Sequence, residues 1–234
     1  MEGPRRIDKR GKLNMLYFEE RRQIIRTCRE LQGCEYFIGT WGNVSMRIGD
    51  HILLTPSKVA YDSMQEEDMV VINLAGEVSE GSRTPTSETE VHRSIYCVRE
   101  DVRAVVHSHT LHCMAVSAIE SLEKVPALTE EMSQLLGGAI PLTRSYVPAG
   151  SHRALGEAAA EAIGSASGVI LRNHGGVACG RTMEETVLTA KVMEKNCRIY
   201  MMLRNNGDMH VIPEEYVQSE RYRFLYAYGH ETNV

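Results

Sequence analysis

Three histidines lie within six positions of the segment DVRAVVHSHTLHCM, directly after a β-branched apolar run. Residues two apart on a strand point to the same face, so a strand through this run would project His107 and His109 side by side. Two imidazoles at that spacing can bind one metal ion, and zinc favours nitrogen ligands. The pattern is also compatible with packed or surface histidines. His112 fits the first turn of a helix, so we expect it to point elsewhere, in a supporting or structural role.

A further candidate ligand stands in the segment GVILRNHGGVACG, where His174 follows a second apolar strand and precedes two glycines. Glycines let the backbone turn sharply and approach a ligand closely. The alternative is a histidine in an ordinary glycine turn. Three histidine ligands would leave one position of a tetrahedral zinc ion open for water or substrate, as catalytic zinc sites do.

A carboxylate for proton transfer is found in RTPTSETEVHRSIY. Thr86 or Ser87 is expected to cap a helix here, and the free N–H groups and dipole at a helix start favour anions such as phosphate. Glu88 is then a candidate acid/base. The alternative is local capping, with Ser87 as the cap and Glu88 or Glu90 complementing the dipole. We expect His92 to be a hydrogen-bonded partner rather than a ligand.

Two further turns offer hydrogen-bond donors. They are GTWGNVS (39–45), with Asn43 and Ser45, and LTPSK (54–58), with a threonine, a serine and a lysine. Each turn alone is common loop chemistry. Beside a three-histidine site, the donor-rich turns together suit a phosphorylated polyol-type substrate that chelates the ion.

The elements that would position these residues can be read from hydrophobic periodicity and turn signals. Hairpins mixed with helices argue against regular βαβ winding and favour a largely antiparallel sheet covered by helices. The expected helices lie in 16–33, 84–100, 152–164 and 182–207. The last is expected to begin with a capping box of Thr182 and Glu185 and to end before Gly207. The hairpins cover 43–57 and 69–81, and strands cover 102–109 and 168–180, the last broken by NHGG.

Composition bounds the class of protein. A chain of 234 residues with 43% hydrophobic residues suits a single α/β domain over 1–234, with 1–14 as a flexible N-terminal tail. The net charge of −5 gives no basic field for nucleic acid or a membrane surface. The apolar runs are too short to span a bilayer. Six scattered cysteines suit reduced thiols in a cytoplasmic protein.

Five motifs occur in a fixed order: GNVS (42–45), TPSK (55–58), TSE (86–88), HSH (107–109) and NHG (173–175). By the order and composition of these motifs, roughly residues 16–205 resemble the class II aldolase/adducin family. The resemblance implies a three-layer α/β/α sandwich with a mainly antiparallel central sheet. It also implies a homotetramer whose active sites lie at subunit interfaces. Adducin-type relatives have lost the metal histidines, and this chain retains all three, which favours an enzyme.

The resemblance also implies roles for particular residues. His107, His109 and His174 would bind a divalent cation, usually Zn²⁺ and sometimes Mn²⁺ or another ion. Glu88 would be the acid/base and could ligate the metal when substrate is absent. The substrate phosphate would be held by Gly42, Asn43, Ser57, Thr86 and Ser87.

The sequence departs from the family pattern at three places. Lys58 stands where a glycine is usual, so either its ammonium approaches the phosphate or the turn is reshaped. Thr86 replaces a serine. Fuculose-phosphate aldolases carry a tyrosine from the adjacent subunit as a proton donor, and VPALTEEM places Glu130 near that position. Glu130 is therefore the candidate for the second acid/base, with Tyr146 or the tyrosines of 222–231 as substitutes.

The leading hypothesis is a zinc-dependent aldolase that cleaves a ketose 1-phosphate of the fuculose, 5-deoxyribulose or methylthioribulose type. Its products would be dihydroxyacetone phosphate and an aldehyde. The same metal site could instead serve a pentulose-phosphate 4-epimerase, a methylthioribulose-phosphate dehydratase or a tetronate-phosphate decarboxylase. An alternative of another class is a non-catalytic, adducin-like oligomerisation module.

Overall fold

The computed structural model describes residues 15–205 and 207–227, so the expected tail at 1–14 lies outside the described residues. The described chain forms a seven-stranded sheet in the order β4-β3-β2-β1-β5-β9-β8, with every neighbouring pair antiparallel. A second, two-stranded sheet pairs β6 with β7. The strands are β1 (Asn43–Ile48), β2 (His51–Leu54), β3 (Val70–Asn73), β4 (Val78–Glu80), β5 (Ala104–Ser108), β6 (Lys124–Val125), β7 (Ile140–Pro141), β8 (Gly168–Leu171) and β9 (Gly175–Gly180).

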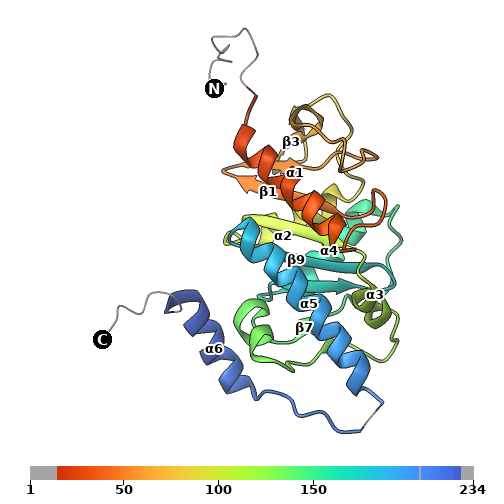
Figure 1. The fold of residues 1–234 in the computed structure, drawn as a ribbon, viewed down its shortest axis with the longest axis vertical. Coiled ribbons are helices and arrows are strands. Elements are labelled where there is room, and N and C mark those ends of the chain that lie inside the picture. The colour runs from red at the N-terminus through yellow and green to blue at the C-terminus, as the bar shows by residue number, and fades with distance from the viewer. Residues whose placement is uncertain (1–14, 206, 228–234) are drawn as a thin grey trace.

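Helices cover both faces of the large sheet (Figure 1). Alternate strand residues face opposite layers. Val106 belongs to the buried apolar cluster that includes residues of the helices at 18–33, 111–117 and 183–203, and the adjacent Val105 belongs to the cluster with residues of the helices at 89–98 and 152–163. This arrangement confirms the predicted sandwich with a mainly antiparallel sheet. The helices are α1 (Phe18–Gly33), α2 (Thr89–Val98), α3 (Leu111–Ser117), α4 (His152–Ile163), α5 (Met183–Leu203) and α6 (Glu214–Tyr226), with short turns η1 (Glu66–Asp68) and η2 (Met132–Leu136).

The predicted hairpins are present. β1 and β2 are joined at Gly49 and Asp50, where Gly49 has a φ of 59°. β3 and β4 are joined through a turn in which Gly76 has a φ of 90° and donates its N–H to the Asn73 carbonyl. In both turns the glycine takes a left-handed conformation that costs other residues energy.

The start of α2 differs from the prediction. Neither Thr86 nor Ser87 is the N-cap, because the helix begins at Thr89 and Glu88 occupies the cap position without a side-chain capping bond. The physical reason lies in the neighbouring turn, where the Thr86 N–H donates to the Thr55 carbonyl at 3.0 Å. This backbone bond keeps the chain extended as far as Thr86, so helical geometry starts later.

At the start of the long helix α5, one of the two hydrogen bonds of the predicted capping box is present. The Thr182 hydroxyl accepts from the Glu185 N–H at 3.1 Å, but the Glu185 carboxylate pairs with Arg181 instead of returning to the cap. The helix ends at Leu203, so Gly207 lies beyond its end as predicted.

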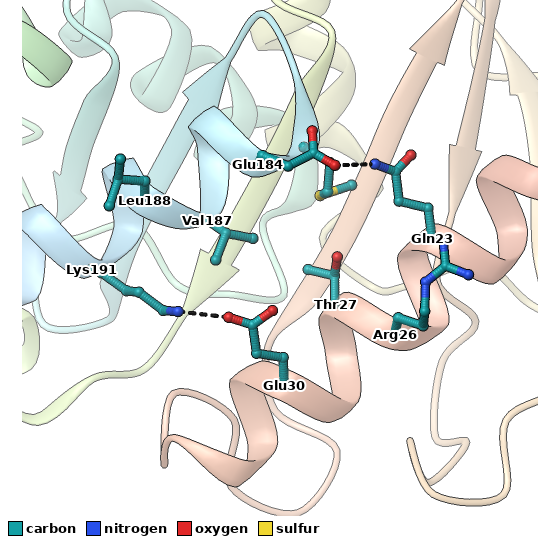
Figure 2. Close-up of a pocket in the computed structure, with 9 residues that line it drawn as sticks. Gln23, Arg26, Thr27, Glu30, Glu184, Val187, Leu188 and Lys191 are labelled. Carbon is teal, nitrogen blue, oxygen red and sulfur yellow. Dashed lines mark hydrogen bonds and ion pairs between the residues drawn. The ribbon is translucent and has the colours of Figure 1, made fainter.

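A surface groove of about 440 Å³ runs between α1 and α5 (Figure 2). Two side-chain bridges cross it, from Gln23 Nε2 to Glu184 Oε1 at 2.8 Å and from Lys191 Nζ to Glu30 Oε1 at 2.6 Å. These bridges connect the two helices across the groove. None of the candidate metal ligands lines this groove. Among the described residues, no helix combines the length and apolar character needed for a membrane span.

Candidate metal centre and active site

The antiparallel pairing of β5 with β9 brings the three histidines together. His107 is the buried fourth residue of β5, and His109 follows directly after the strand. β9 pairs alongside with Ser108 opposite Gly176, so the turn between β8 and β9 places His174 at the same end. Ligand atoms of these histidines and of Glu88 all lie within 4.8 Å of one another.

The imidazoles meet edge to face, as ligands around one ion do. Ring centroids are 4.8 Å apart for His107 and His109, 4.9 Å for His107 and His174, and 5.0 Å for His109 and His174. Zinc–nitrogen bonds of about 2.0–2.1 Å in a tetrahedron place two ligand nitrogens about 3.3 Å apart. The 2.9 Å between the Nε2 atoms of His107 and His109 is close to that separation.

A backbone carbonyl fixes the orientation of one ligand. His107 Nδ1 donates to the Gly176 carbonyl at 3.0 Å, which directs Nε2 toward the other histidines. Ligating histidines commonly make such a bond through the nitrogen that does not bind metal. Three imidazole nitrogens and one carboxylate, oriented in this way, form a donor set that fits a divalent cation of the zinc type.

Gly175 is required by the close approach of this turn to β5. A Cβ atom at this position would lie 2.5 Å from the Ser108 carbonyl oxygen and 3.2 Å from Cδ2 of His109. The preceding Asn173 adopts a φ of 53°, which tightens the turn. The glycine after His174 therefore allows the close backbone approach that the sequence suggested.

Glu88 contacts two of the histidines and one amide. Its Oε1 accepts from His174 Nε2 at 2.8 Å, and its Oε2 lies 3.3 Å from His107 Nε2. Oε2 also accepts from Asn43 Nδ2 at 2.6 Å. The carboxylate is buried at the start of α2, where the positive end of the helix dipole supports its charge.

The ionisation of the cluster follows from these contacts. Burial opposes the charge on Glu88, but the charge of His107 and the hydrogen bonds from His107, His174 and Asn43 outweigh it and hold the pKa of the carboxyl below its ordinary value. Burial likewise opposes the charge on His107, and Glu88 outweighs it, so the pKa of His107 is raised. Burial and the charges of the other two histidines lower the pKa of His109 to about 3. Glu88 and His107 thus support each other's charges within the cluster.

The turns expected to bind phosphate lie against each other. The Ser57 N–H donates to the Thr84 carbonyl at 2.9 Å, and Pro56 bridges to Pro85. Among the described residues, the hydroxyls of Ser57 and Ser87 have no hydrogen-bond partner, so both can face a ligand.

Gly42 and Lys58 take left-handed conformations, with φ values of 108° and 60°. A glycine at position 58 would adopt this conformation without strain, whereas lysine accepts it at a cost of about 1–2 kcal/mol. The turn therefore keeps a glycine-like shape. The Lys58 side chain is exposed.

Asn43 has a role that the sequence did not reveal. It lies opposite His107 in the pairing of β1 with β5, and its side chain is engaged by Glu88 and His92. One N–H of the Asn43 amide is therefore engaged by Glu88 and its carbonyl oxygen by His92. The prediction that His92 is a hydrogen-bonded partner is confirmed. The spacing of Glu88 and His92, four apart on a helix, was the available signal.

Three other residues complete the description. His112 turns away from the cluster, and its Nδ1 lies 2.6 Å from Glu194 Oε1. Trp41 was not predicted near the site, but its ring stacks at 6.3 Å from that of His109. Glu130 is exposed beside η2 and is not among the clustered residues. Its expected role is at the site of a neighbouring copy.

Comparison with known proteins places this geometry in a family. The sequence model described as "Class II Aldolase and Adducin N-terminal domain" matches residues 22–201. The chain belongs to this family. The L-fuculose phosphate aldolase of Escherichia coli strain K12 is 35% identical over 180 residues, which cover 77% of this chain and 81% of that protein. The Haemophilus influenzae L-fuculose phosphate aldolase is 31% identical over 208 residues, covering 88% and 94%.

Solved structures agree with this placement. A structure described as L-fuculose 1-phosphate aldolase superposes with a TM-score of 0.85 at 26% identity, covering 91% of this chain and 99% of that one. The chain is thus a class II aldolase, an enzyme of the lyase class. Class II aldolases use a divalent metal and act on phosphorylated sugars, and the Glu88–histidine cluster is the group in this chain that could bind such an ion.

Proposed function

We propose that this class II aldolase cleaves a ketose 1-phosphate, of the fuculose, 5-deoxyribulose or methylthioribulose type, to dihydroxyacetone phosphate and an aldehyde. The observation that carries the proposal is the convergence of His107, His109 and His174 with Glu88 within 4.8 Å. The similarity to L-fuculose phosphate aldolases over most of the chain supports the substrate class. Zn²⁺ is the proposed ion, because imidazole nitrogens and a carboxylate suit it.

A divalent cation held by the three histidines would supply Lewis-acid stabilisation for the negative charge that develops on the substrate ketone. In the cleavage direction, a base removes the proton of the C4 hydroxyl and the C3–C4 bond breaks. The oxygen of C4 becomes the aldehyde, and the bonding electron pair passes to C3 and the adjoining carbonyl. Glu88 delivers a proton to C3, which yields dihydroxyacetone phosphate.

Phosphate binding is proposed for the turns beside Glu88. Thr86 and Ser87 precede the start of α2, and the turn with Ser57 is joined to them by backbone hydrogen bonds. Gly42 precedes Asn43, whose side chain contacts Glu88 at the same helix start. These contacts support a role for the four residues in holding the phosphate. The backbone N–H groups and dipole at a helix start favour phosphate. Asn43 joins this group through its backbone N–H or through the amide hydrogen that Glu88 does not hold.

The remaining acid/base is proposed to come from a neighbouring subunit of a homotetramer. Glu130 is exposed and is our candidate, because a residue that acts on another copy's site must reach the surface of its own chain. We also propose that the protein works in the cytoplasm, since its scattered cysteines, all free in this structure, suit a reducing compartment.

Exchange of the C3 proton of dihydroxyacetone phosphate in D₂O tests the proposal without knowledge of the aldehyde. With zinc-loaded wild-type protein, dihydroxyacetone phosphate should take up deuterium at C3, and proton NMR measures this uptake. With Glu88→Gln it should take up none. A panel of ketose and ketonate phosphates then identifies the substrate by its products. Release of an epimer, a dehydrated ketone or carbon dioxide, rather than dihydroxyacetone phosphate, would contradict the aldolase assignment. A biological role that Glu88→Gln leaves intact would favour the alternative of a non-catalytic module.

A further inference from the structure

Two rows of polar side chains face each other behind Glu88. Glu88, His92 and Tyr96 are spaced four residues apart at and within α2, and Asn43 and Ser45 are two apart on β1. Four residues of helix rise about 6 Å, and two residues of strand rise about 6.8 Å. The two spacings match closely enough for the rows to alternate.

The alternation produces an unbroken line of hydrogen bonds. Glu88 Oε2 lies 2.6 Å from Asn43 Nδ2, and Asn43 Oδ1 lies 2.5 Å from His92 Nε2. His92 Nδ1 lies 2.7 Å from Ser45 Oγ, which lies 2.8 Å from the Tyr96 hydroxyl. We call Asn43, Ser45, His92 and Tyr96 the support row.

All members of the support row are buried. Ser45 and His92 are 0% exposed, Tyr96 is 1% exposed and Asn43 is 5% exposed. Water therefore cannot replace a lost partner without rearrangement, and buried polar groups left without a partner are costly. Each member of the row consequently depends on the next for its orientation.

The chemistry of the groups sets the direction of every bond. A carboxylate only accepts, so the NH₂ group of Asn43 faces Glu88 and the Asn43 carbonyl must accept from His92 Nε2–H. Burial, followed by the charge of His107, lowers the pKa of His92 to about 3, so its Nδ1 carries no proton and accepts from the Ser45 hydroxyl. The Ser45 oxygen then accepts from the Tyr96 hydroxyl. Tyr96 is thus the terminal donor of a row that ends on the carboxylate.

The two oxygens of Glu88 consequently have different surroundings. Oε2 is bonded to Asn43, and so to the support row, and lies 3.3 Å from His107 Nε2, while Oε1 contacts His174. The His174 nitrogen that contacts Oε1 is one of the candidate metal-ligating atoms. When that nitrogen is engaged by a cation, Oε1 loses its donor and Oε2 keeps its own.

We propose that the support row is a positioning device that anchors Oε2 of Glu88 and thereby leaves Oε1 as the oxygen that exchanges a proton with C3 of the substrate. His92, Ser45 and Tyr96 act through Asn43 and are positioning residues. The inference rests on the proposed function, in which Glu88 transfers that proton. To that function the inference adds which oxygen of Glu88 carries the proton, and it names the support row as the residues that select this oxygen.

The first test reads the row without any reaction. In ¹⁵N NMR of the imidazole nitrogens in the full-length protein, with and without zinc, His92 should be neutral with its proton on Nε2. An Nδ1-protonated tautomer at neutral pH, or an imidazolium, would overturn the proposed direction of the row.

The second test measures deuterium exchange at C3 of dihydroxyacetone phosphate. Ser45→Ala and His92→Leu should lower the maximal exchange rate about 10–100-fold, the range typical of lost supporting partners, with KM and zinc affinity changed much less. Tyr96→Phe, at the far end, should have the smallest effect. His92→Gln, whose Nε2 can still donate to Asn43, should restore much of the rate that His92→Leu loses.

Thr189→Val is the matched control. Thr189 is a fully buried hydroxyl on α5 that donates only to the Glu185 carbonyl, so its loss should leave exchange unchanged. Thermal melting identifies any variant that fails to fold, and Tyr96→Phe changes packing least. Unchanged exchange in folded support-row variants would overturn the positioning role alone. Absence of exchange in the zinc-loaded wild type would contradict the proposed function and, with it, the proton-carrying role of Oε1.

Discussion

His174 Nε2 lies 2.8 Å from Glu88 Oε1, although one residue stands in the turn between β8 and β9 and the other at the start of α2. The contact joins a metal-ligand candidate to the proposed acid/base. It places proton transfer directly beside the site where a cation would hold the substrate ketone.

Replacement of Glu88 should abolish turnover while the fold and the metal site persist. Glu88→Gln keeps the size of the side chain and an oxygen that can accept from Asn43, but it cannot carry the proton. General acid–base groups contribute about 10²–10⁴-fold to rate, so we expect a loss of that order in the rate of C3 proton exchange. Glu90→Gln is the matched control, because Glu90 lies on the same helix and pairs with Arg93 outside the cluster. Equal losses in both variants would contradict the assignment.

Loss of one histidine should weaken metal binding sharply. His174→Ala removes one of three imidazoles. Loss of a residue that only supports a ligand typically lowers metal affinity roughly 10–100-fold, so we expect the loss of a ligand to lower zinc affinity at least as much. Competition with a chromophoric chelator measures this affinity. His152→Ala, at the exposed start of α4, should leave it unchanged. Retained stoichiometric zinc in His174→Ala would contradict the ligand set.

Trp41 should report on the metal site by fluorescence. It is the only tryptophan in the chain, and its ring is stacked 6.3 Å from that of His109. Binding of Co²⁺ to the histidines should therefore quench its emission, with saturation at one equivalent, and Zn²⁺ should displace the quencher. His109→Ala should shift the titration to higher Co²⁺ concentrations. Emission that does not respond to Co²⁺ would argue against metal binding beside this residue.

A methyl group at Gly175 should damage the site from the backbone. The Cβ of Gly175→Ala would lie 2.5 Å from the Ser108 carbonyl, so the turn must shift away from β5 and carry His174 with it. We expect a destabilisation of about 1–3 kcal/mol in urea unfolding and weaker zinc binding. Gly150→Ala, where no atom lies within 4 Å of the added Cβ, should show neither effect.

The stability of the metal-free protein should fall with acid partly because of His92. Its folded pKa of about 3 lies below the ordinary value of 6.5, so from about pH 6.5 down to pH 3 the unfolded chain binds a proton that the folded chain does not. Each such group lowers the free energy of unfolding by up to about 1.4 kcal/mol per pH unit. Urea unfolding gives the free energy of unfolding at pH 6 and at pH 5. Between these two pH values it should fall by about 1 kcal/mol less in His92→Gln than in the wild type. An identical loss in both proteins would contradict a buried, neutral His92.

Local patterns were sufficient for the parts of the site that depend on strand ends and turns. The spacing of His107 and His109, and the glycines after His174, predicted where each imidazole would stand, and antiparallel pairing of β5 with β9 supplied their convergence. The cap of α2 was predicted wrongly, because the backbone bond from Thr86 to Thr55 joins segments that local sequence cannot relate.

Other features depend on contacts between distant segments. Asn43 looked like part of a phosphate turn, and only the pairing of β1 with β5 shows that its amide faces Glu88. The stacking of Trp41 on His109 likewise requires the folded sheet. Side-chain roles of this kind follow from register and layer packing rather than from spacing along the chain.

Crystals of the zinc-loaded protein, measured at the zinc absorption edge, test the central claim most directly. The claim predicts one anomalous peak among His107, His109 and His174, at about 2.0–2.1 Å from a nitrogen of each imidazole and beside the Glu88 carboxylate. A map of fully zinc-loaded protein with no peak there, or with its peak at other residues, would contradict it.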